Sequence, residues 1–183
     1  MQRNPIRVLA ALALAWTLTA ASSADLLAQE RISPFLGGGL ALGTGDLAQD
    51  TGAGWLFFGG VDLPMRVPGL SVGTTVSHAR IPYDGGFDEH ESITAVMGEV
   101  AYVIGAESPW PVKPFLRGGL GLSIYRYDPG AIGADPQTLS RPGVTADAGI
   151  TFRVGGAWAF AGARFLGEVD RGYLGIHGGL AIR

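Results

Sequence analysis

From residue 31 onward, apolar and polar side chains alternate with a period of two residues, which is the repeat of a β-strand. Between residues 143 and 154, one parity is apolar and the other carries threonine, aspartate and arginine. Turn-forming residues separate such stretches, which predicts eight strands near residues 31–43, 52–62, 69–80, 92–104, 113–126, 143–154, 157–166 and 173–182. Most are longer than the ~5–6 residues of soluble proteins and close to the ~9–11 that cross a bilayer.

The connections between these strands alternate in character. Segments 63–68, 105–111 and 155–156 are short or contain proline, and they follow every second strand. Segments 44–51, 81–91, 127–142 and 167–172 are mostly longer and acidic. Short turns at one end and long loops at the other are typical of transmembrane barrels. An internal repeat supports this layout, since residues 34–43 and 114–123 are identical at seven of ten positions.

The composition of the polar parity indicates which face meets lipid. A water-facing exterior would be rich in lysine and glutamate, but this parity is mostly glycine, serine, threonine and alanine, and Lys113 is the only lysine of the chain. Such small residues suit the crowded lumen of an eight-stranded barrel. The run Trp55–Phe58 shows no clear alternation. Two aromatic girdles are expected, with Trp55, Tyr125, Tyr127, Phe165 and Tyr173 toward the loops and Phe35, Trp110, Phe115, Phe152 and Trp158 toward the turns.

These patterns predict an all-β fold, an eight-stranded antiparallel up-and-down transmembrane β-barrel over residues 25–183. Composition agrees, because 30 glycines among 183 residues disfavour helices. The absence of cysteine excludes disulfides and thiolate chemistry, and a formal net charge of −3 gives no sign of a nucleic-acid surface. Before the barrel, two arginines, the 14-residue apolar run 8–21 and Ser22-Ser23-Ala24 predict a signal peptide over 1–24, with cleavage near Gln29 as an alternative.

The segment Pro34–Leu40, its repeat at 114–120 and the glycine-rich last strand resemble the small outer-membrane β-barrel proteins typified by OmpA and OmpX. The resemblance implies a monomeric barrel in an outer membrane. Its implied partners are outer-membrane lipid, lipopolysaccharide and the barrel-assembly machinery. Members of this family usually end in an aromatic residue, whereas this chain ends Ala181-Ile182-Arg183. No cofactor is implied.

Charged residues on the inward parity predict a polar network in the lumen. Its expected members are Asp62, Glu99, Arg117, Asp147, Arg153 and His177, with Arg164 as a further candidate. Because an isolated charge is costly in a narrow interior, these acids and arginines are expected to pair across the barrel. The network is interpreted as a structural plug. A small gated pore would use the same residues, and the sequence leaves that alternative open.

The densest acidic cluster is expected in an outer loop, at Asp84, Asp88, Glu89 and Glu91. Its spacing does not match an EF-hand, and we expect a solvated loop without a bound metal. Divalent cations between the acidic loops and lipopolysaccharide phosphates are a hypothesis for this end.

Catalytic motifs are weak. A set of Ser123, His177 and Asp147 has no nucleophile elbow. The Ser77-His78 pair with Asp84 faintly resembles lipid A deacylases, but neighbours in a strand face opposite sides. The predicted function is therefore a non-enzymatic structural or surface-interaction role. A gated pore, a lipid-modifying barrel enzyme and a soluble lipocalin-like barrel are the alternatives.

Overall fold

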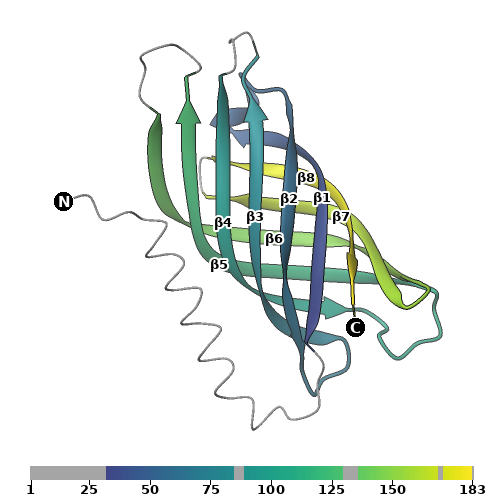
Figure 1. Cartoon of the computed structure of the whole chain (residues 1–183). Coiled ribbons are helices and arrows are strands. Elements are labelled where there is room, and N and C mark those ends of the chain that lie inside the picture. The colour runs from purple at the N-terminus through teal and green to yellow at the C-terminus, as the bar shows by residue number, and fades with distance from the viewer. Residues whose placement is uncertain (1–31, 85–88, 130–135, 169–170, 183) are drawn as a thin grey trace. The chain divides into compact units, whose positions relative to one another are not determined.

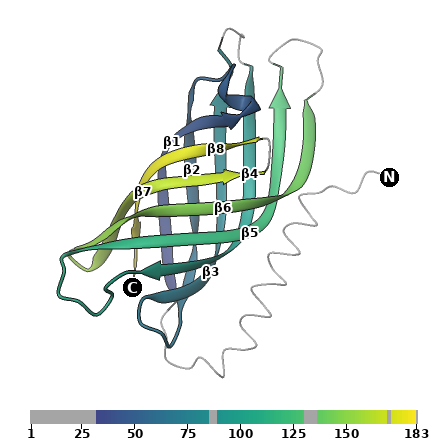
Figure 2. The same ribbon diagram turned by 180° about the vertical axis from the view of Figure 1, so that it is seen from behind.

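The computed structural model describes residues 32–84, 89–129, 136–168 and 171–182, so the predicted signal peptide lies outside the described residues. Eight antiparallel strands form a single sheet, in which each strand pairs with the next and β8 returns to pair with β1 (Figures 1 and 2). The predicted fold class, an eight-stranded up-and-down barrel, is confirmed. The strands are β1 (Ser33–Gly45), β2 (Ala53–Pro64), β3 (Leu70–Pro82), β4 (His90–Val103), β5 (Val112–Asp128), β6 (Gln137–Val154), β7 (Ala157–Gly167) and β8 (Arg171–Ala181).

The turn end of the barrel carries residues 65–69, 104–111 and 155–156, as expected from the short connections. Gly155 begins the tightest of these turns with a φ of 60°, a left-handed conformation that glycine adopts without steric cost. At the loop end, the 3-10 turn η2 (Asp46–Ala48) lies between β1 and β2. Among the described residues, no helix has the length and apolarity to cross a membrane.

The expectation of a loop over residues 127–142 is wrong for its second half. Residues 137–142 continue β6 and pair with β5, from Tyr127 opposite Gln137 to Leu122 opposite Pro142. This part of the hairpin is exposed on both faces, because every residue from 136 to 142 is exposed. A strand without a buried face has no period-two hydrophobic pattern, and its sequence therefore looks like a polar loop.

Large apolar side chains cover the outside of the barrel, while the inside holds the buried charged residues together with a cluster of apolar side chains. In the run that was ambiguous from sequence, Trp55 and Phe57 are 39% and 61% exposed, whereas Leu56 and Phe58 are 0% and 3% exposed. Strand β2 therefore alternates like its neighbours. The exposed apolar band of β1 to β6 and β8 includes Leu36, Leu40, Val61, Val72, Val76, Val100, Leu116, Leu120, Val144, Ile150, Leu174, Ile176 and Leu180. Such an apolar exterior is the surface of a barrel that spans a membrane.

The predicted aromatic girdles are partly wrong. Phe35, Phe115, Tyr125 and Tyr173 are buried in the lumen, because they have the inward parity of their strands. Position near a strand end does not place a ring at the membrane interface unless its parity also points outward.

Inward-facing glycines make room for the side chains that fill the lumen. A Cβ atom on Gly179 would lie 2.4 Å from the ring of Phe160, and a Cβ atom on Gly119 would lie 2.7 Å from Cγ of Glu99. Both distances are shorter than normal van der Waals contact, so the missing side chains are part of how the interior is packed.

Candidate functional site

One half of a charged network in the lumen is centred on Arg117 of β5. Its Nη2 atom lies 2.6 Å from Oδ2 of Asp62 on β2, and its Nη1 atom lies 3.2 Å from Oε2 of Glu99 on β4. The Thr75 hydroxyl on β3 donates a hydrogen bond to the same Glu99 oxygen. The guanidinium carbon of Arg117 also lies 4.3 Å from the ring centroid of Phe35 on β1. Arg117 thus bridges two acids and packs on an aromatic face.

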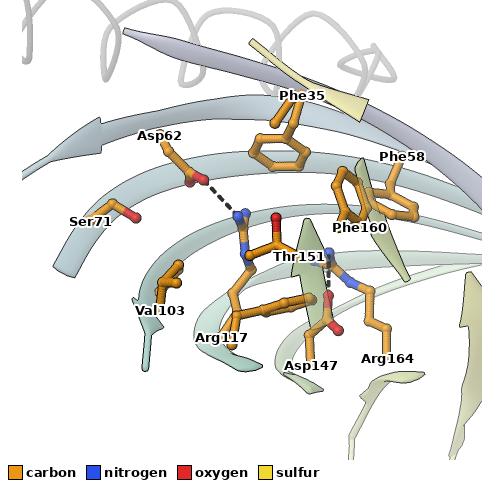
Figure 3. Close-up of a pocket in the computed structure, with 13 residues that line it drawn as sticks. Phe35, Phe58, Asp62, Ser71, Val103, Arg117, Asp147, Thr151, Phe160 and Arg164 are labelled. Atoms are coloured by element: carbon orange, nitrogen blue, oxygen red, sulfur yellow. Dashed lines mark hydrogen bonds and ion pairs between the residues drawn. The ribbon is translucent and has the colours of Figure 1, made fainter. Parts of the chain in front are cut away.

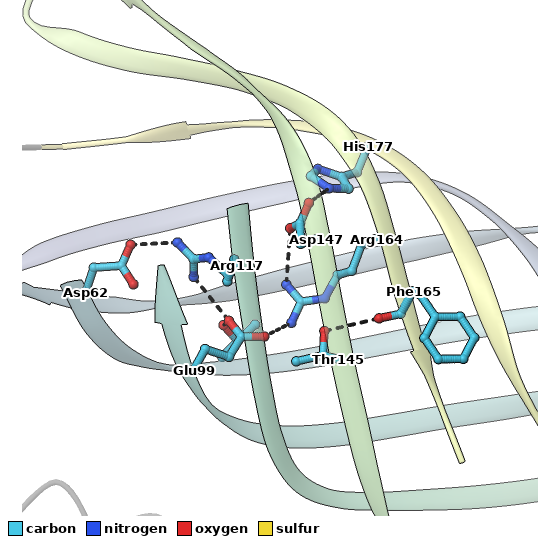
Figure 4. Close-up of polar contacts among 9 residues, drawn as sticks. Asp62, Glu99, Arg117, Thr145, Asp147, Arg164, Phe165 and His177 are labelled. Atoms are coloured by element: carbon cyan, nitrogen blue, oxygen red, sulfur yellow. Dashed lines mark hydrogen bonds and ion pairs between the residues drawn. The ribbon is translucent and has the colours of Figure 1, made fainter. Parts of the chain in front are cut away.

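The other half is centred on Arg164 of β7, whose side chain is 0% exposed. Arg164 donates a hydrogen bond to Oε1 of Glu99, and its Nη1 atom lies 3.9 Å from Oδ2 of Asp147 on β6. Asp147 contacts Nε2 of His177 on β8 at 3.0 Å. The ring of His177 meets that of Phe58 at 5.0 Å in a T-shaped arrangement. Glu99 joins the two halves, and the result is one continuous chain of polar contacts across the lumen (Figure 4).

The network connects every strand of the barrel. Six strands supply its charged or ionisable members, while β3 supplies Thr75 and β1 supplies Phe35. Burial of these charges is costly, and mutual pairing with hydrogen bonds offsets that cost. The arrangement is therefore a set of cross-links between strands that are distant in sequence.

Strand register explains why these residues meet. Arg117 lies directly opposite Asp147 in the β5–β6 ladder, and Asp147 lies opposite Arg164 in the β6–β7 ladder. All three have the inward parity, so opposite charges alternate along one row of the sheet. The importance of Arg164 could have been found by aligning β6 and β7 across their two-residue turn.

The structure brings together five of the six residues expected in the lumen network, and Arg164 in addition. Arg153 does not join them. It has the inward parity but lies beside the turn at the end of β6, where it is exposed and its Nε donates to the carbonyl oxygen of Gly155 at 3.2 Å. The parity of a residue does not give its depth in the barrel, so the sequence pattern does not distinguish Arg153 from the buried charged residues.

A cavity lies on the turn-end side of the network. Four phenylalanines line it, and Asp62, Arg117, Asp147 and Arg164 form its polar wall (Figure 3). Its empty volume is about 530 Å³, part of it open to solvent. The four rings belong to Phe35, Phe58, Phe115 and Phe160. This chamber is a recess in the turn-end half of the barrel.

The loop-end half of the lumen contains a layer of buried apolar side chains. Leu47 of η2 is 2% exposed, and Ile81, Ile93 and Leu166 are 0% exposed. Leu47 reaches this layer because η2 turns inward between β1 and β2, where the Thr51 hydroxyl bonds to the Leu47 carbonyl oxygen. These residues form a buried apolar layer between the charged network and the loops.

The predicted acidic outer loop divides into two environments. Asp84 is exposed, Glu89 accepts a hydrogen bond from the Tyr127 hydroxyl, and Asp88 lies outside the described residues. Glu91 is only 1% exposed and does not belong to a solvated loop, since β4 begins at His90 and gives Glu91 the inward parity.

At the mouth of the barrel, Glu91 accepts a hydrogen bond from the Tyr83 hydroxyl at 3.0 Å and lies 3.7 Å from Nη1 of Arg171. Burial and the neighbouring Glu91 carboxylate raise the pKa of Tyr83, which remains a donor at neutral pH. Within the described ranges, no group of three or more His, Asp or Glu side chains is arranged to hold a metal ion.

The candidate catalytic sets are not assembled in the described part of the chain. Ser77 is buried on the inward side of β3 and His78 lies on the outward side, as strand geometry requires. His177 contacts Asp147, and among the described residues no hydrogen bond joins it to Ser123.

Solved structures of bacterial surface proteins have a similar fold. Neisserial surface protein A superposes with a TM-score of 0.64 at 14% identity, covering 82% of this chain and 96% of that chain. The outer membrane protein Ail of Yersinia pestis gives a TM-score of 0.54 at 15% identity, covering 85% and 99%. OprG of Pseudomonas aeruginosa gives 0.50 at 12% identity, covering 84% and 97%. This chain has the fold of the small outer-membrane β-barrels.

The predicted resemblance to OmpA- and OmpX-like barrels is thus confirmed at the level of the fold. No protein-family model and no curated protein matches the sequence.

Proposed function

We propose that this chain is an outer-membrane barrel protein with a closed lumen, which acts as a structural and surface-interaction protein rather than as a channel. In this proposal a signal peptide over residues 1–24 directs the chain across the inner membrane. The barrel then anchors its loop end at the cell surface.

The observation that carries this proposal is the apolar exterior of the barrel, which surrounds an interior that holds buried charges. Leu120 and Leu36 are 70% and 69% exposed on the exterior, whereas the interior holds Glu99 and Arg164 at 4% and 0% exposure. A soluble ligand-binding barrel of lipocalin type would have a charged exterior around an apolar interior. The apolar exterior of this barrel favours lipid as the surrounding solvent.

Acidic residues at the loop end supply a surface for interactions. Asp46, Asp50 and Asp84 are exposed there, beyond the apolar band. Divalent cations could connect such carboxylates to the phosphates of lipopolysaccharide. Unchanged protein stability after chelation of divalent cations in native membranes would count against this part of the proposal.

Cell fractionation tests the location. We expect the protein in the outer-membrane fraction, resistant to alkaline carbonate and extracted only by detergent. Recovery in the soluble periplasmic fraction without detergent would overturn the assignment.

A charged residue introduced on the exterior tests whether a particular position of the barrel contacts lipid. Leu120→Arg places a charge in the middle of the apolar band and should cost about 2–4 kcal/mol in a bilayer. Val67→Arg is the matched control, since Val67 is 54% exposed in the turn between β2 and β3. Folding into lipid vesicles should be impaired for Leu120→Arg alone. Equal tolerance of the two substitutions would mean that Leu120 faces water.

A further inference from the structure

A basic patch lies on the outward face of β3, β4 and β5, close to the loop end. It consists of His78 and Arg80 of β3, Ser92 and Thr94 of β4, and Arg126 of β5. These three strands lie side by side in Figure 1. Arg80 pairs with Ser92, which pairs with Arg126, and His78 pairs with Thr94 in the next row. All five have the outward parity, opposite to the buried residues of the same strands.

The side chains around this patch are ordered by contacts on the outer surface. Nδ1 of His78 lies 2.8 Å from the Thr94 hydroxyl oxygen, and the His78 ring lies 5.3 Å from the ring of Trp55. An Nη2 atom of Arg80 lies 3.2 Å from Nδ1 of His90. The ion pairs of the described residues include neither Arg80 nor Arg126. Two guanidinium groups thus face outward without a carboxylate at ion-pair distance in the described chain.

The patch lies at the edge of the apolar band. His78, Thr94 and Ile124 form one row across β3, β4 and β5. The next outward-facing row toward the centre of the barrel is fully apolar and consists of Val76, Val96 and Leu122. The row of Arg80 and Arg126 lies four residues from these apolar positions, so the exterior changes from apolar to basic over about 13 Å along the strands. Trp55 beside the patch is the kind of residue found at that interface.

The patch is basic in a chain whose overall charge is negative. The chain has a net charge of −3, and exposed aspartates at the loop end include Asp46, Asp50 and Asp84. One carboxylate, Asp128, borders the patch two residues beyond Arg126. The overall charge of the chain therefore does not explain why Arg80 and Arg126 lie together. An anion bound on the lipid-facing side would explain it.

The spacing fits a phosphate group. Arg80 and Arg126 are separated by one intervening strand, so their backbones lie about 9.6 Å apart. Two long side chains can converge across that gap on an anion in front of Ser92 and Thr94, whose hydroxyls can donate to it. Arginine forms charge-assisted hydrogen bonds with phosphate oxygens in this way.

We propose that the basic patch binds the phosphate of an anionic lipid headgroup in the leaflet next to the barrel loops. Arg80 and Arg126 hold the phosphate oxygens, the hydroxyls of Ser92 and Thr94 complete the site, and Trp55 packs beside it. This inference rests on the proposed membrane location. It adds one specific lipid-binding site to the shell of lipids that surrounds the barrel.

Fluorescence quenching by brominated lipids tests the site, because Trp55 lies beside it. The full chain, purified from membranes, is reconstituted in vesicles of phosphatidylcholine with increasing brominated phosphatidic acid, and separately with brominated phosphatidylcholine. Subtracting the signal of the Trp55→Phe variant isolates the contribution of Trp55. The test variant carries both Arg80→Gln and Arg126→Gln. The control is Arg66→Gln, because Arg66 is an exposed arginine at the opposite end of the barrel, beside the turns.

The site predicts that Trp55 prefers phosphatidic acid over phosphatidylcholine, by about fivefold for each arginine that contacts the phosphate. The double variant should lose this preference, and Arg66→Gln should keep it. Equal quenching by both lipids would overturn the site while leaving the membrane barrel intact. Loss of the preference in millimolar inorganic phosphate would show that free phosphate, not lipid, is the ligand. Absence of quenching by either lipid would overturn the membrane location itself.

Discussion

Replacement of Arg164 by methionine should strongly destabilise the barrel. The Arg164 side chain is 0% exposed, and it binds Glu99 and lies 3.9 Å from Asp147. After the change, Glu99 keeps Arg117 at 3.2 Å and Asp147 keeps His177 at 3.0 Å. Each acid therefore loses one of its partners while it remains buried. Breaking a buried ion pair on one side costs about 3–5 kcal/mol, and this is the loss in unfolding free energy that we expect.

The assay is equilibrium urea unfolding of the protein in lipid vesicles, followed by tryptophan fluorescence and by the mobility of the unheated barrel in gels. Arg141→Met is the matched control, because the Arg141 side chain is 46% exposed and lies 3.4 Å from Glu168. A surface pair of this kind contributes less than about 1 kcal/mol. Similar losses for the two variants would refute the view that the lumen charges act as buried cross-links.

Should Arg164→Met fail to fold at all, Arg164→Lys keeps the test measurable. Lysine retains the positive charge, but its single ammonium group cannot reproduce the planar contacts of a guanidinium with Glu99 and Asp147. We expect a stability between those of the wild type and Arg164→Met. Wild-type stability in Arg164→Lys would mean that net charge alone, and not the geometry of the network, is required.

Two pairs of glycine substitutions give further predictions. Gly39→Ala should cost about 1–3 kcal/mol in urea unfolding, because its Cβ would lie 1.9 Å from the backbone oxygen of Ile176, whereas Gly98→Ala on the exposed outer face should be nearly neutral. Gly155→Ala should cost about 1–2 kcal/mol, since φ is 60° there and nothing crowds the position. Gly156→Ala, in the same turn with equally open space, should cost less; the reverse order would contradict the assigned turn geometry.

Much of the barrel can be predicted from sequence because the period of two residues records which side of each strand is buried. The eight strands and their closure follow from that pattern, and so does the inward orientation of Asp62, Glu99 and His177. The pattern fails where the two faces of a strand do not differ. Residues 137–142 have two exposed faces, and their sequence therefore predicts a loop.

The site was less predictable, because parity gives the face of a residue but not its depth. Arg153 and Asp147 have the same parity on β6, yet Arg153 lies at the exposed turn and Asp147 is 6% exposed in the lumen. Arg164 shows the opposite difference, because the sequence gives it only as a further candidate and the structure places it in the centre of the network. The outward positions of β7 that precede Arg164 are all alanines, so the strand has little contrast in hydrophobicity. Only the register with β6 shows that Arg164 lies opposite Asp147.

Ion conductance in planar lipid bilayers tests the closed lumen most directly. The network from Asp62 to His177 and the apolar layer at Leu47 should leave no continuous path for ions. We therefore expect the purified, folded barrel to produce no discrete current steps under an applied voltage. Reproducible steps would contradict this account. Steps whose size changes in Arg117→Gln would show that the ions pass through the network and that the protein is a pore.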